Sequence, residues 1–458
     1  MDMTSGPILG KLISFTLPVL LGNVLQMLYN AADVIVVGRS ALGSFAVGAV
    51  GSTGSLVNLI INLFIGLGVG VNVIAAQHIG AGRKHEIPDI IGTAIALALV
   101  CGVFVMGIGM AFSSTFLSWM DTPADILPLA SKYLFIYFIG VPASLIYNFC
   151  AAVLRAYGDT KRPLIYLTVS GFVNVLLNMY FIFIVGLDVD GVAYATVISQ
   201  YLSATLVVVR LLRGEDYCRF ELRNIRFIAD KVIGIVKVGL PAGIYSSMFS
   251  ISNVIIQTAV NSFGSAVIVS GCAASSNVDN FVYTAVNAVS IATTSFAGQN
   301  MGARRFDRIR KVMRISFAVE VTIWAVVAGL YMIFRNTVFA FYLPDDPAAV
   351  TFGMLKSGIE ISSYFILGGM DVCTGTLRGM GHSTLTTVIS MIGTCGVRIL
   401  WIFTVFYPSK AVATVEESIK LLFAVYPVSW IVTFIVLFIF CEIMIARASR
   451  RRAMSRGT

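Results

Sequence analysis

Long apolar runs separated by short polar connectors fill most of this 458-residue sequence. The hydrocarbon core of a bilayer is roughly 30 Å thick, so a helix that crosses it needs about 20 mostly apolar residues. Twelve runs reach that length, and they are continuous rather than alternating, which favours helices over the strands of a transmembrane barrel. The runs lie at about 12–38, 46–75, 88–113, 128–153, 163–186, 190–212, 231–262, 266–297, 310–334, 349–376, 384–407 and 418–446. The pattern predicts an all-α polytopic membrane protein with twelve transmembrane helices.

Composition supports this class. Hydrophobic residues make up 57% of the chain and charged residues only 12%, whereas a soluble globular domain carries roughly a quarter of charged residues. So few charges cannot cover a water-exposed surface of this size. The composition therefore excludes a soluble enzyme, a disordered chain and a coiled coil.

The distribution of positive charge predicts the orientation in the membrane. The net charge is +9, but the basic residues lie mainly in connectors between apolar runs, so we interpret them as contacts to lipid headgroups and exclude a nucleic-acid partner. If the termini and every even-numbered connector share one side, that side holds 25 of the 32 basic residues. Arg398 lies within a span, and the opposite side holds Arg39, Lys132, Arg335, Lys356, Lys410 and Lys420. The positive-inside rule then places both termini in the cytoplasm.

Three local signatures recur after 223, 222 and 223 residues. They are Leu17-Pro18 with Leu240-Pro241, Gln77-x-x-Gly80-Ala81 with Gln299-x-x-Gly302-Ala303, and Leu154-Arg155-x-x-Gly158 with Leu377-Arg378-x-x-Gly381. Six helices per repeat is an even number, so both halves enter the membrane from the same side. We therefore expect two six-helix bundles related by a pseudo-two-fold axis along the membrane normal, an arrangement typical of alternating-access transporters. The predicted parts are an amino-terminal lobe at 1–212, a cytoplasmic linker at 213–230, a carboxy-terminal lobe at 231–446 and a basic cytoplasmic tail at 447–458.

Pro18 and Pro241 occupy equivalent positions inside spans. Each proline removes a backbone hydrogen bond and can kink its helix. A role in helix bending during transport and an ordinary packing role are both open at these positions. Gly66, Gly68 and Gly70 predict close approach between helices.

Asp33 is the clearest intramembrane acid of the first half. A charge within the bilayer is costly, so such a residue is a functional candidate, and a short aspartate side chain reaches the surface poorly. Asn174 and Asn178 share one face of the fifth span, and Thr196 and Gln200 share one face of the sixth. Each pair alone would serve only to bridge helices. Together with Asp33, these oxygens would bind a hard monovalent cation or a proton.

The second half has its acids elsewhere, at Asp279, Glu320, Glu360 and Asp371. Arg398 lies within the eleventh span and should need an acidic partner, with Asp371 or Glu360 as the candidates. A structural ion pair and a substrate site are both consistent with this group.

The sequence contains no GxxxxGK[ST] phosphate loop, no HExxH and no GxSxG. ATP is therefore not expected as the direct energy source. We predict that the protein is not an enzyme and requires no cofactor.

Several of these segments resemble the multidrug and toxic compound extrusion (MATE) family over about residues 8–446. The resemblance rests on Leu17-Pro18, Asp33-Val-Ile-Val-Val-Gly38-Arg39, Gln77-His-Ile-Gly80-Ala81-Gly82, Leu154-Arg155-Ala-Tyr-Gly158-Asp159-Thr160 and the second-half copies. It implies a twelve-helix antiporter in a bacterial cytoplasmic membrane, surrounded by lipids, which we expect to act as a monomer. It also implies that Asp33, Asn174, Asn178 and Thr196 form the cation-coupling site, which is a metal site only if the ion is Na⁺.

The sequence departs from the family at two places. Asn178 stands where many members have a second aspartate, so this site has one formal negative charge and the choice between Na⁺ and H⁺ stays open. Met248-Phe249-Ser250 replaces the seventh-helix glutamate of a sodium-driven branch, and Asp371 lies about one turn from the tenth-helix acid of that branch. The sequence is more similar to the bacterial branch that relies on the amino-terminal lobe.

The leading hypothesis is a secondary antiporter that exports amphipathic, often cationic organic compounds in exchange for Na⁺ or H⁺ by alternating access. One alternative is a flippase for a lipid-linked saccharide, which would need a more cationic cavity than Arg398 alone supplies. A second alternative is a membrane receptor without transport, which the repeat and the buried acid disfavour.

Overall fold

The computed structural model describes residues 1–458 apart from 41, 121, 215–218, 345, 411 and 458. The described residues form helices of α, 3₁₀ and π type and contain no strand. In the first half the elements are α1 (Ile8–Val37), α2 (Ser44–Gly80), η1 (Lys84–Glu86), α3 (Ile87–Trp119), α4 (Leu127–Ala156), α5 (Lys161–Met179), η2 (Tyr180–Ile184), α6 (Val189–Leu212) and η3 (Leu222–Asn224). In the second half they are α7 (Ala229–Asn261), α8 (Ala266–Gly302), α9 (Phe306–Tyr342), α10 (Pro347–Gly379), α11 (Ser383–Ser390), η4 (Met391–Gly396), α12 (Val397–Trp401), η5 (Ile402–Phe406), α13 (Tyr407–Lys410), α14 (Val415–Phe423) and α15 (Val425–Gly457).

Ten helical stretches within the described residues are long and apolar enough to cross a membrane, judged by length and composition. The long helices α8 and α10 are not among the ten, although they coincide with the predicted spans 266–297 and 349–376. Both carry ionisable side chains, including Asp279 on α8 and Lys356 on α10. The all-helical membrane class is therefore confirmed, while the count of twelve stays a prediction.

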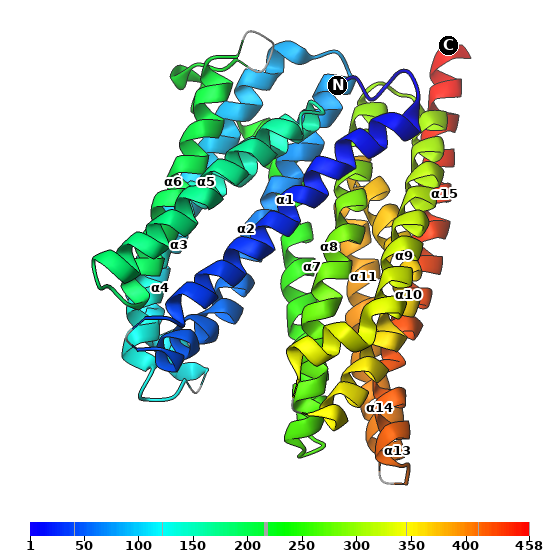
Figure 1. The fold of residues 1–458 in the computed structure, drawn as a ribbon. Helices are drawn as coiled ribbons and strands as arrows, with labels where there is room; N and C mark the ends of the chain where they lie inside the picture. The colour runs from blue at the N-terminus through cyan, green and yellow to red at the C-terminus, as the bar shows by residue number, and fades with distance from the viewer. Residues whose placement is uncertain (41, 121, 215–218, 345, 411, 458) are drawn as a thin grey trace. The chain divides into compact units, whose positions relative to one another are not determined.

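The chain divides into two compact units. The first comprises Met1–Asp2 and Leu17–Gly243, and the second comprises Met3–Thr16 and Ile244–Thr458. In the first unit, α4 packs against α2, α3 and α6, and α5 lies beside α6 (Figure 1). Small and branched apolar side chains of these helices form one continuous core.

The second unit is arranged around α10. This helix packs against α8, α9 and α15, with α14 against its early turns (Figure 1). The interface of α8 with α10 is closely packed: a Cβ added to Gly271 on α8 would lie 2.3 Å from the Ala349 carbonyl oxygen on α10. The α8–α10 interface therefore brings ionisable groups of two long helices together inside this unit.

Residues near the start of the amino-terminal half belong to the second unit, and the first residues of α7 belong to the first unit. Residues Met3–Thr16 are part of the second unit, where the Met3 amide donates to Gln299 Oε1 at 2.9 Å. The first turns of α7 are part of the first unit, where Lys231 contacts Glu86 and His78. The unit boundaries consequently fall inside α1 and α7, next to Pro18 and Pro241.

Two predicted spans are less regular than their apolar patterns indicate. The span expected at 384–407 is a continuous run from α11 to α13 that contains the π-helical segments η4 and η5. The span expected at 418–446 is divided between α14 and α15, which meet at Ala424 shortly before Pro427. A proline cannot donate the backbone hydrogen bond of a continuing helix, which is consistent with a new helix beginning here.

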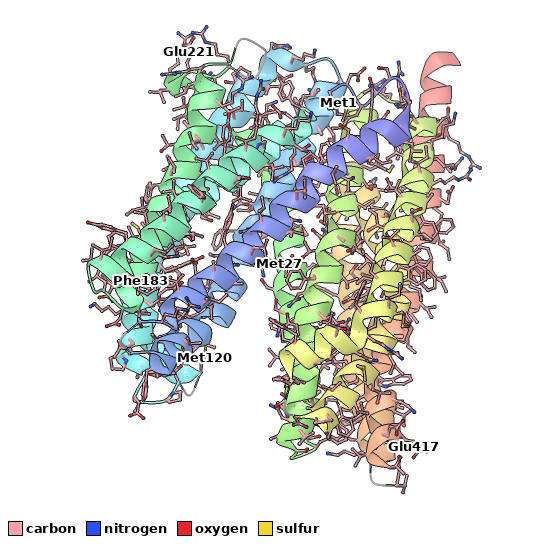
Figure 2. All side chains as sticks on the ribbon, viewed as in Figure 1. Met1, Met27, Met120, Phe183, Glu221 and Glu417 are labelled. Atoms are coloured by element: carbon pink, nitrogen blue, oxygen red, sulfur yellow. The ribbon has the colours of Figure 1, made fainter. Side chains whose placement is uncertain are left out.

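Large apolar side chains remain exposed along the outer faces of the helices. Phe183 in η2 is one of them, with 53% of its surface exposed, and it projects from the first unit in Figure 2. In water this much exposed apolar surface would drive aggregation, whereas lipid chains cover it without cost. The exposed surface therefore agrees with the membrane class.

Candidate functional site

Asp33 lies in the last part of α1, four residues before the helix ends at Val37. Its side chain is half-buried and faces α5, where Asn174 and Asn178 are 5% and 0% exposed. The one-turn spacing of the two asparagines places both amides on the side of α5 that meets α1. The structure therefore brings together three of the four residues predicted for the cation-coupling site.

The Asn178 side chain links the other two polar groups. Its amide Nδ2 donates to Asp33 Oδ1 and also to Asn174 Oδ1, the second bond at 3.3 Å. No ion pair of Asp33 occurs among the residues described, so its carboxylate is solvated by a neutral amide. Asn178 lies just before the π-helical segment η2, and such segments are frequent at functional sites.

Several oxygens of α5 and α6 have no hydrogen-bond partner within the described structure. They are Asn178 Oδ1, Thr196 Oγ1 and Gln200 Oε1, all buried. Burying an oxygen without a hydrogen-bond partner costs free energy. A bound cation or a proton donor would supply the missing partner, so such oxygens suit an ion-binding site. Thr196 and Gln200 are one turn apart on α6, which packs against α5. The Thr196 hydroxyl makes no hydrogen bond to Asp33 in the described structure, so its place in the site stays a prediction.

Two tyrosines of α4 were not anticipated from the sequence. Tyr133 and Tyr137 stack with ring centroids 6.0 Å apart, and both interact electrostatically with Asp33. Their i, i+4 spacing in the sequence already placed both rings on one face of the helix. An aromatic pair within an apolar span is ordinarily interpreted as a packing contact, so it did not indicate a site. They add hydroxyl groups near the carboxylate.

A second buried group lies in the second unit. Lys356 on α10 is 5% exposed and forms ion pairs with Asp279 on α8 and with Glu360, one turn further along α10. The sequence assigned Lys356 to the basic residues at a membrane surface, which is wrong. Two acids within reach stabilise a buried ammonium, and only the packing of α8 on α10 brings Asp279 there.

Arg398 does not form the ion pair predicted with Asp371 or Glu360. Its guanidinium instead donates to Asn253 Oδ1 at 3.1 Å and to Ser429 Oγ at 3.5 Å, and it lies over the rings of Phe249 and Tyr426. Neutral oxygens and aromatic faces can stabilise a buried guanidinium without an acid.

Glu360 pairs with Lys356, and it interacts with Arg398 electrostatically without an ion-pair contact. Asp371 lies eleven residues further along α10, roughly 16 Å along the helix axis, and its Oδ2 has no hydrogen-bond partner in the described chain. No ion pair therefore links these three residues, and a shared substrate site stays a prediction.

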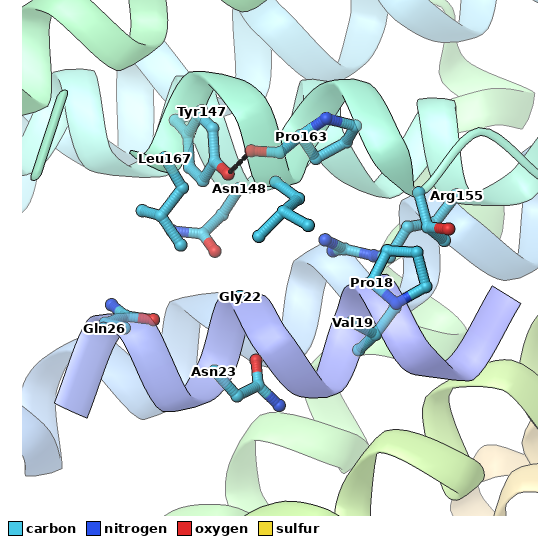
Figure 3. A pocket seen from close by; sticks show the side chains of 12 residues that line it. Pro18, Val19, Gly22, Asn23, Gln26, Tyr147, Asn148, Arg155, Pro163 and Leu167 are labelled. Carbon is cyan, nitrogen blue, oxygen red and sulfur yellow. Dashed lines mark hydrogen bonds between the residues drawn. The ribbon is translucent and has the colours of Figure 1, made fainter. Parts of the chain in front are cut away.

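Pro18 lines a small cavity of about 90 Å³ within the first unit. Asn23 and Gln26 of α1 and Arg155 of α4 also line it, as Figure 3 shows. The Tyr147 hydroxyl donates to the Pro163 carbonyl oxygen at 2.9 Å on the opposite wall. Pro18 and Pro241 both lie inside continuous helices, and their role in bending stays a prediction.

Comparison with known proteins gives a consistent result. The profile of the MatE family matches the chain twice, at residues 18–180 and 241–404. "Probable multidrug resistance protein YoeA" of Bacillus subtilis (strain 168) is 30% identical over 407 residues, covering 86% of this chain and 86% of that protein. "Probable multidrug resistance protein YpnP" of the same organism is 27% identical and covers 85% of this chain and 87% of its own length.

A solved structure shares the fold. It is described as the outward-facing conformation of a multidrug resistance MATE family transporter of the MOP superfamily. The TM-score is 0.88 at 20% sequence identity, and 98% of each chain is covered. The two profile matches cover most of the chain and begin at Pro18 and at Pro241, which agrees with the sequence repeat. The chain is an integral membrane protein and belongs to the MatE family of multidrug and toxic compound extrusion transporters.

Proposed function

We propose that this protein is a secondary active antiporter that exports amphipathic, often cationic organic compounds in exchange for Na⁺ or H⁺. The observation that carries the proposal is the contact of Asp33 with Asn178 inside apolar helices of a MatE-family chain. The multidrug resistance names of its relatives support the substrate class. No ATP-binding loop is present in the sequence, which supports an ion gradient as the energy source.

The residues that would hold the coupling ion are Asp33, Asn174, Asn178 and Thr196. Asp33 supplies one negative charge, and the unpartnered Asn178 and Thr196 oxygens supply neutral ligands. Oxygen ligands suit Na⁺, and a carboxyl group held by an amide equally suits H⁺. We expect the bound ion to neutralise Asp33 and thereby change the packing of α1 against α5. A coupled transporter requires this kind of difference in affinity between its conformations.

The proposed architecture is the one that the repeat predicts. It has twelve spans in two six-helix bundles, with lobes at 1–212 and 231–446, a linker at 213–230 and a tail at 447–458. The double match of the family profile supports two related halves. Pro18 and Pro241 would provide the bending points for alternating access, and their position beside the unit boundaries supports this role. We place the monomer in a bacterial cytoplasmic membrane with both termini in the cytoplasm and without a cofactor.

The test uses purified protein in vesicles, with Na⁺ and pH gradients imposed separately and substrate flux measured under each. Asp33→Asn should abolish gradient-driven flux because the variant lacks the charge that the ion neutralises. Asp125→Asn, in an exposed connector, is the matched control and should transport normally. Full flux in Asp33→Asn would remove this residue from the mechanism.

A further inference from the structure

Lys356 is the centre of a polar cluster enclosed in the second unit. Its ammonium group donates to Ser276 Oγ at 2.6 Å and to the Cys272 carbonyl oxygen at 3.3 Å. Asp279 Oδ2 lies 3.4 Å from it and Glu360 Oε1 lies 3.9 Å from it. The ammonium is therefore surrounded by a hydroxyl, a main-chain carbonyl and two carboxylates.

These ligands are of the kind that bind a hard metal cation. Sites for such ions combine carboxylates, hydroxyls and backbone carbonyls around one central charge. A lysine ammonium has three N–H donors, and here all the polar groups around them are oxygens. Here α8 contributes three of the four oxygens, from Cys272, Ser276 and Asp279, and their spacing places them on one face of that helix.

The cluster also has unused binding capacity. Asp279 and Glu360 are 6% and 4% exposed, and no hydrogen-bond donor in the described part of the chain reaches Asp279 Oδ1. Glu360 Oε1 is the oxygen that faces the Lys356 ammonium, and Ser275 Oγ donates to Asp279 Oδ2 at 3.1 Å. Both carboxylates border a cavity of about 390 Å³ within the second unit, which Asn280 and Tyr364 also line. This volume is large enough for water and a small cation to reach the oxygens.

The Asp33 group differs in one chemical respect. It has a carboxylate and neutral oxygens but no ion-paired lysine or arginine within the described residues. Each half thus has a buried carboxylate group, and in the second half a side chain of the protein already supplies the positive charge.

We infer that Lys356 is a tethered cation that occupies a monovalent-cation site built by α8 and α10. The second unit then takes up no Na⁺, because the Lys356 ammonium holds the position that the ion would take. Removal of this ammonium converts the cluster into a Na⁺ site. The inference concerns the second unit alone and stands whether or not Asp33 couples transport to an ion.

The experiment measures the melting temperature of the full-length protein against Na⁺ concentration. N-methyl-D-glucamine chloride keeps the ionic strength constant, and every variant carries Asp33→Asn so that the first-half group is inactive. A ligand that binds only the folded state raises the melting temperature in a saturable manner. Asp33→Asn alone should show no saturable response to Na⁺, whereas Asp33→Asn with Lys356→Met should show one.

Two further variants identify the site. Adding Asp279→Asn to the Lys356→Met protein should greatly weaken or abolish the Na⁺ response. Lys420→Met is the matched control because Lys420 also has a glutamate one turn away, Glu416, but in an exposed pair. This control should not become responsive to Na⁺.

Two results would overturn the inference. The first is the absence of any Na⁺ response in Lys356→Met, which would make Lys356 a structural ion-pair partner only. The second is a saturable response in Asp33→Asn alone that Asp279→Asn removes, which would mean that the site is not filled by the lysine. If Lys356→Met does not fold, the double variant Lys356→Met with Glu360→Gln replaces it, because one fewer carboxylate is left without a counter-charge. The same Na⁺ titration is then measured on the double variant, and the same two results would overturn the inference.

Discussion

At the scale of single residues, Asp33 of the first unit is accompanied by a neutral amide. Asn178 donates to the Asp33 carboxylate, while Thr196 Oγ1 is buried without a partner in the described structure. An amide adds no net charge, so it can stay hydrogen-bonded to a carboxylate whether or not a cation is bound there. This chemistry leaves Asp33 available for a mobile cation.

Thr196→Val tests whether the unpartnered hydroxyl belongs to the ion site. Valine keeps the shape of threonine and removes the oxygen, so we expect the half-saturating concentration of the driving ion to rise about three- to tenfold. Maximal flux should change little. The measurement is substrate flux into vesicles at a series of ion concentrations.

Thr205→Val is the control on the same helix. The Thr205 hydroxyl is exposed and donates to the Tyr201 carbonyl oxygen at 2.7 Å. If both valine variants have the same ion dependence as the original protein, Thr196 is not a ligand.

At the scale of helices, glycines on α2 and α7 allow contact between the two backbones in the first unit. A Cβ on Gly243 would lie 2.1 Å from the Leu63 carbonyl oxygen, and one on Gly70 would lie 2.2 Å from the Ile235 carbonyl oxygen. Gly66 and Gly70 are four residues apart, as are Gly239 and Gly243. Small residues at this spacing are the usual means by which membrane helices approach closely.

Gly243→Ala should destabilise the protein because the helices must separate to admit the methyl group. We expect a loss of about 1–3 kcal/mol in the free energy of unfolding, with reduced thermal stability in detergent. Gly107→Ala on α3 is the control, since its added Cβ would have no neighbour within 4 Å. Equal stability of the two variants would show that the close approach is not required.

At the scale of the whole molecule, the first residues of the chain stabilise the second unit. Arg308 on α9 donates to the carbonyl oxygens of Met3, Ser5 and Gly6 at 3.1, 2.7 and 2.8 Å. The amino-terminal segment is therefore held in position by a helix more than 300 residues away in sequence.

Arg308→Ala should lower the free energy of unfolding by about 1.5–3 kcal/mol, because several charge-assisted hydrogen bonds are lost together. Chemical unfolding in detergent measures this change. Arg335→Ala, on an exposed turn of the same helix, should have little effect. A similar loss in both variants would indicate a general effect of removing charge from α9.

The sequence predicted the helices and the Asp33 group for related reasons. The cost of placing a side chain in lipid depends mainly on its type, so apolar runs identify spans and a buried acid stands out within them. The spacing of Asn174 and Asn178 follows from helix geometry and requires no knowledge of the neighbouring helices. Their meeting with Asp33 was expected through the family resemblance and is now observed.

Lys356 and Arg398 show the limit of this reasoning. The sequence assigned Lys356 to a membrane surface and expected an acid beside Arg398, whereas Lys356 is paired with two acids and Arg398 contacts amide, hydroxyl and aromatic groups. Neither result follows from residue type, because a buried charge can be stabilised in several ways.

The sequence by itself determined the membrane class, the repeat and the family, because hydropathy and local motifs are properties of short segments. Only the tertiary structure decided the partners of the buried charges. The helix that meets α10 at Lys356 is selected by the close packing of small residues between distant segments such as Gly271 and Ala349. That packing placed Asp279 beside the ammonium and left Asp371 without a partner for its Oδ2 in the described chain.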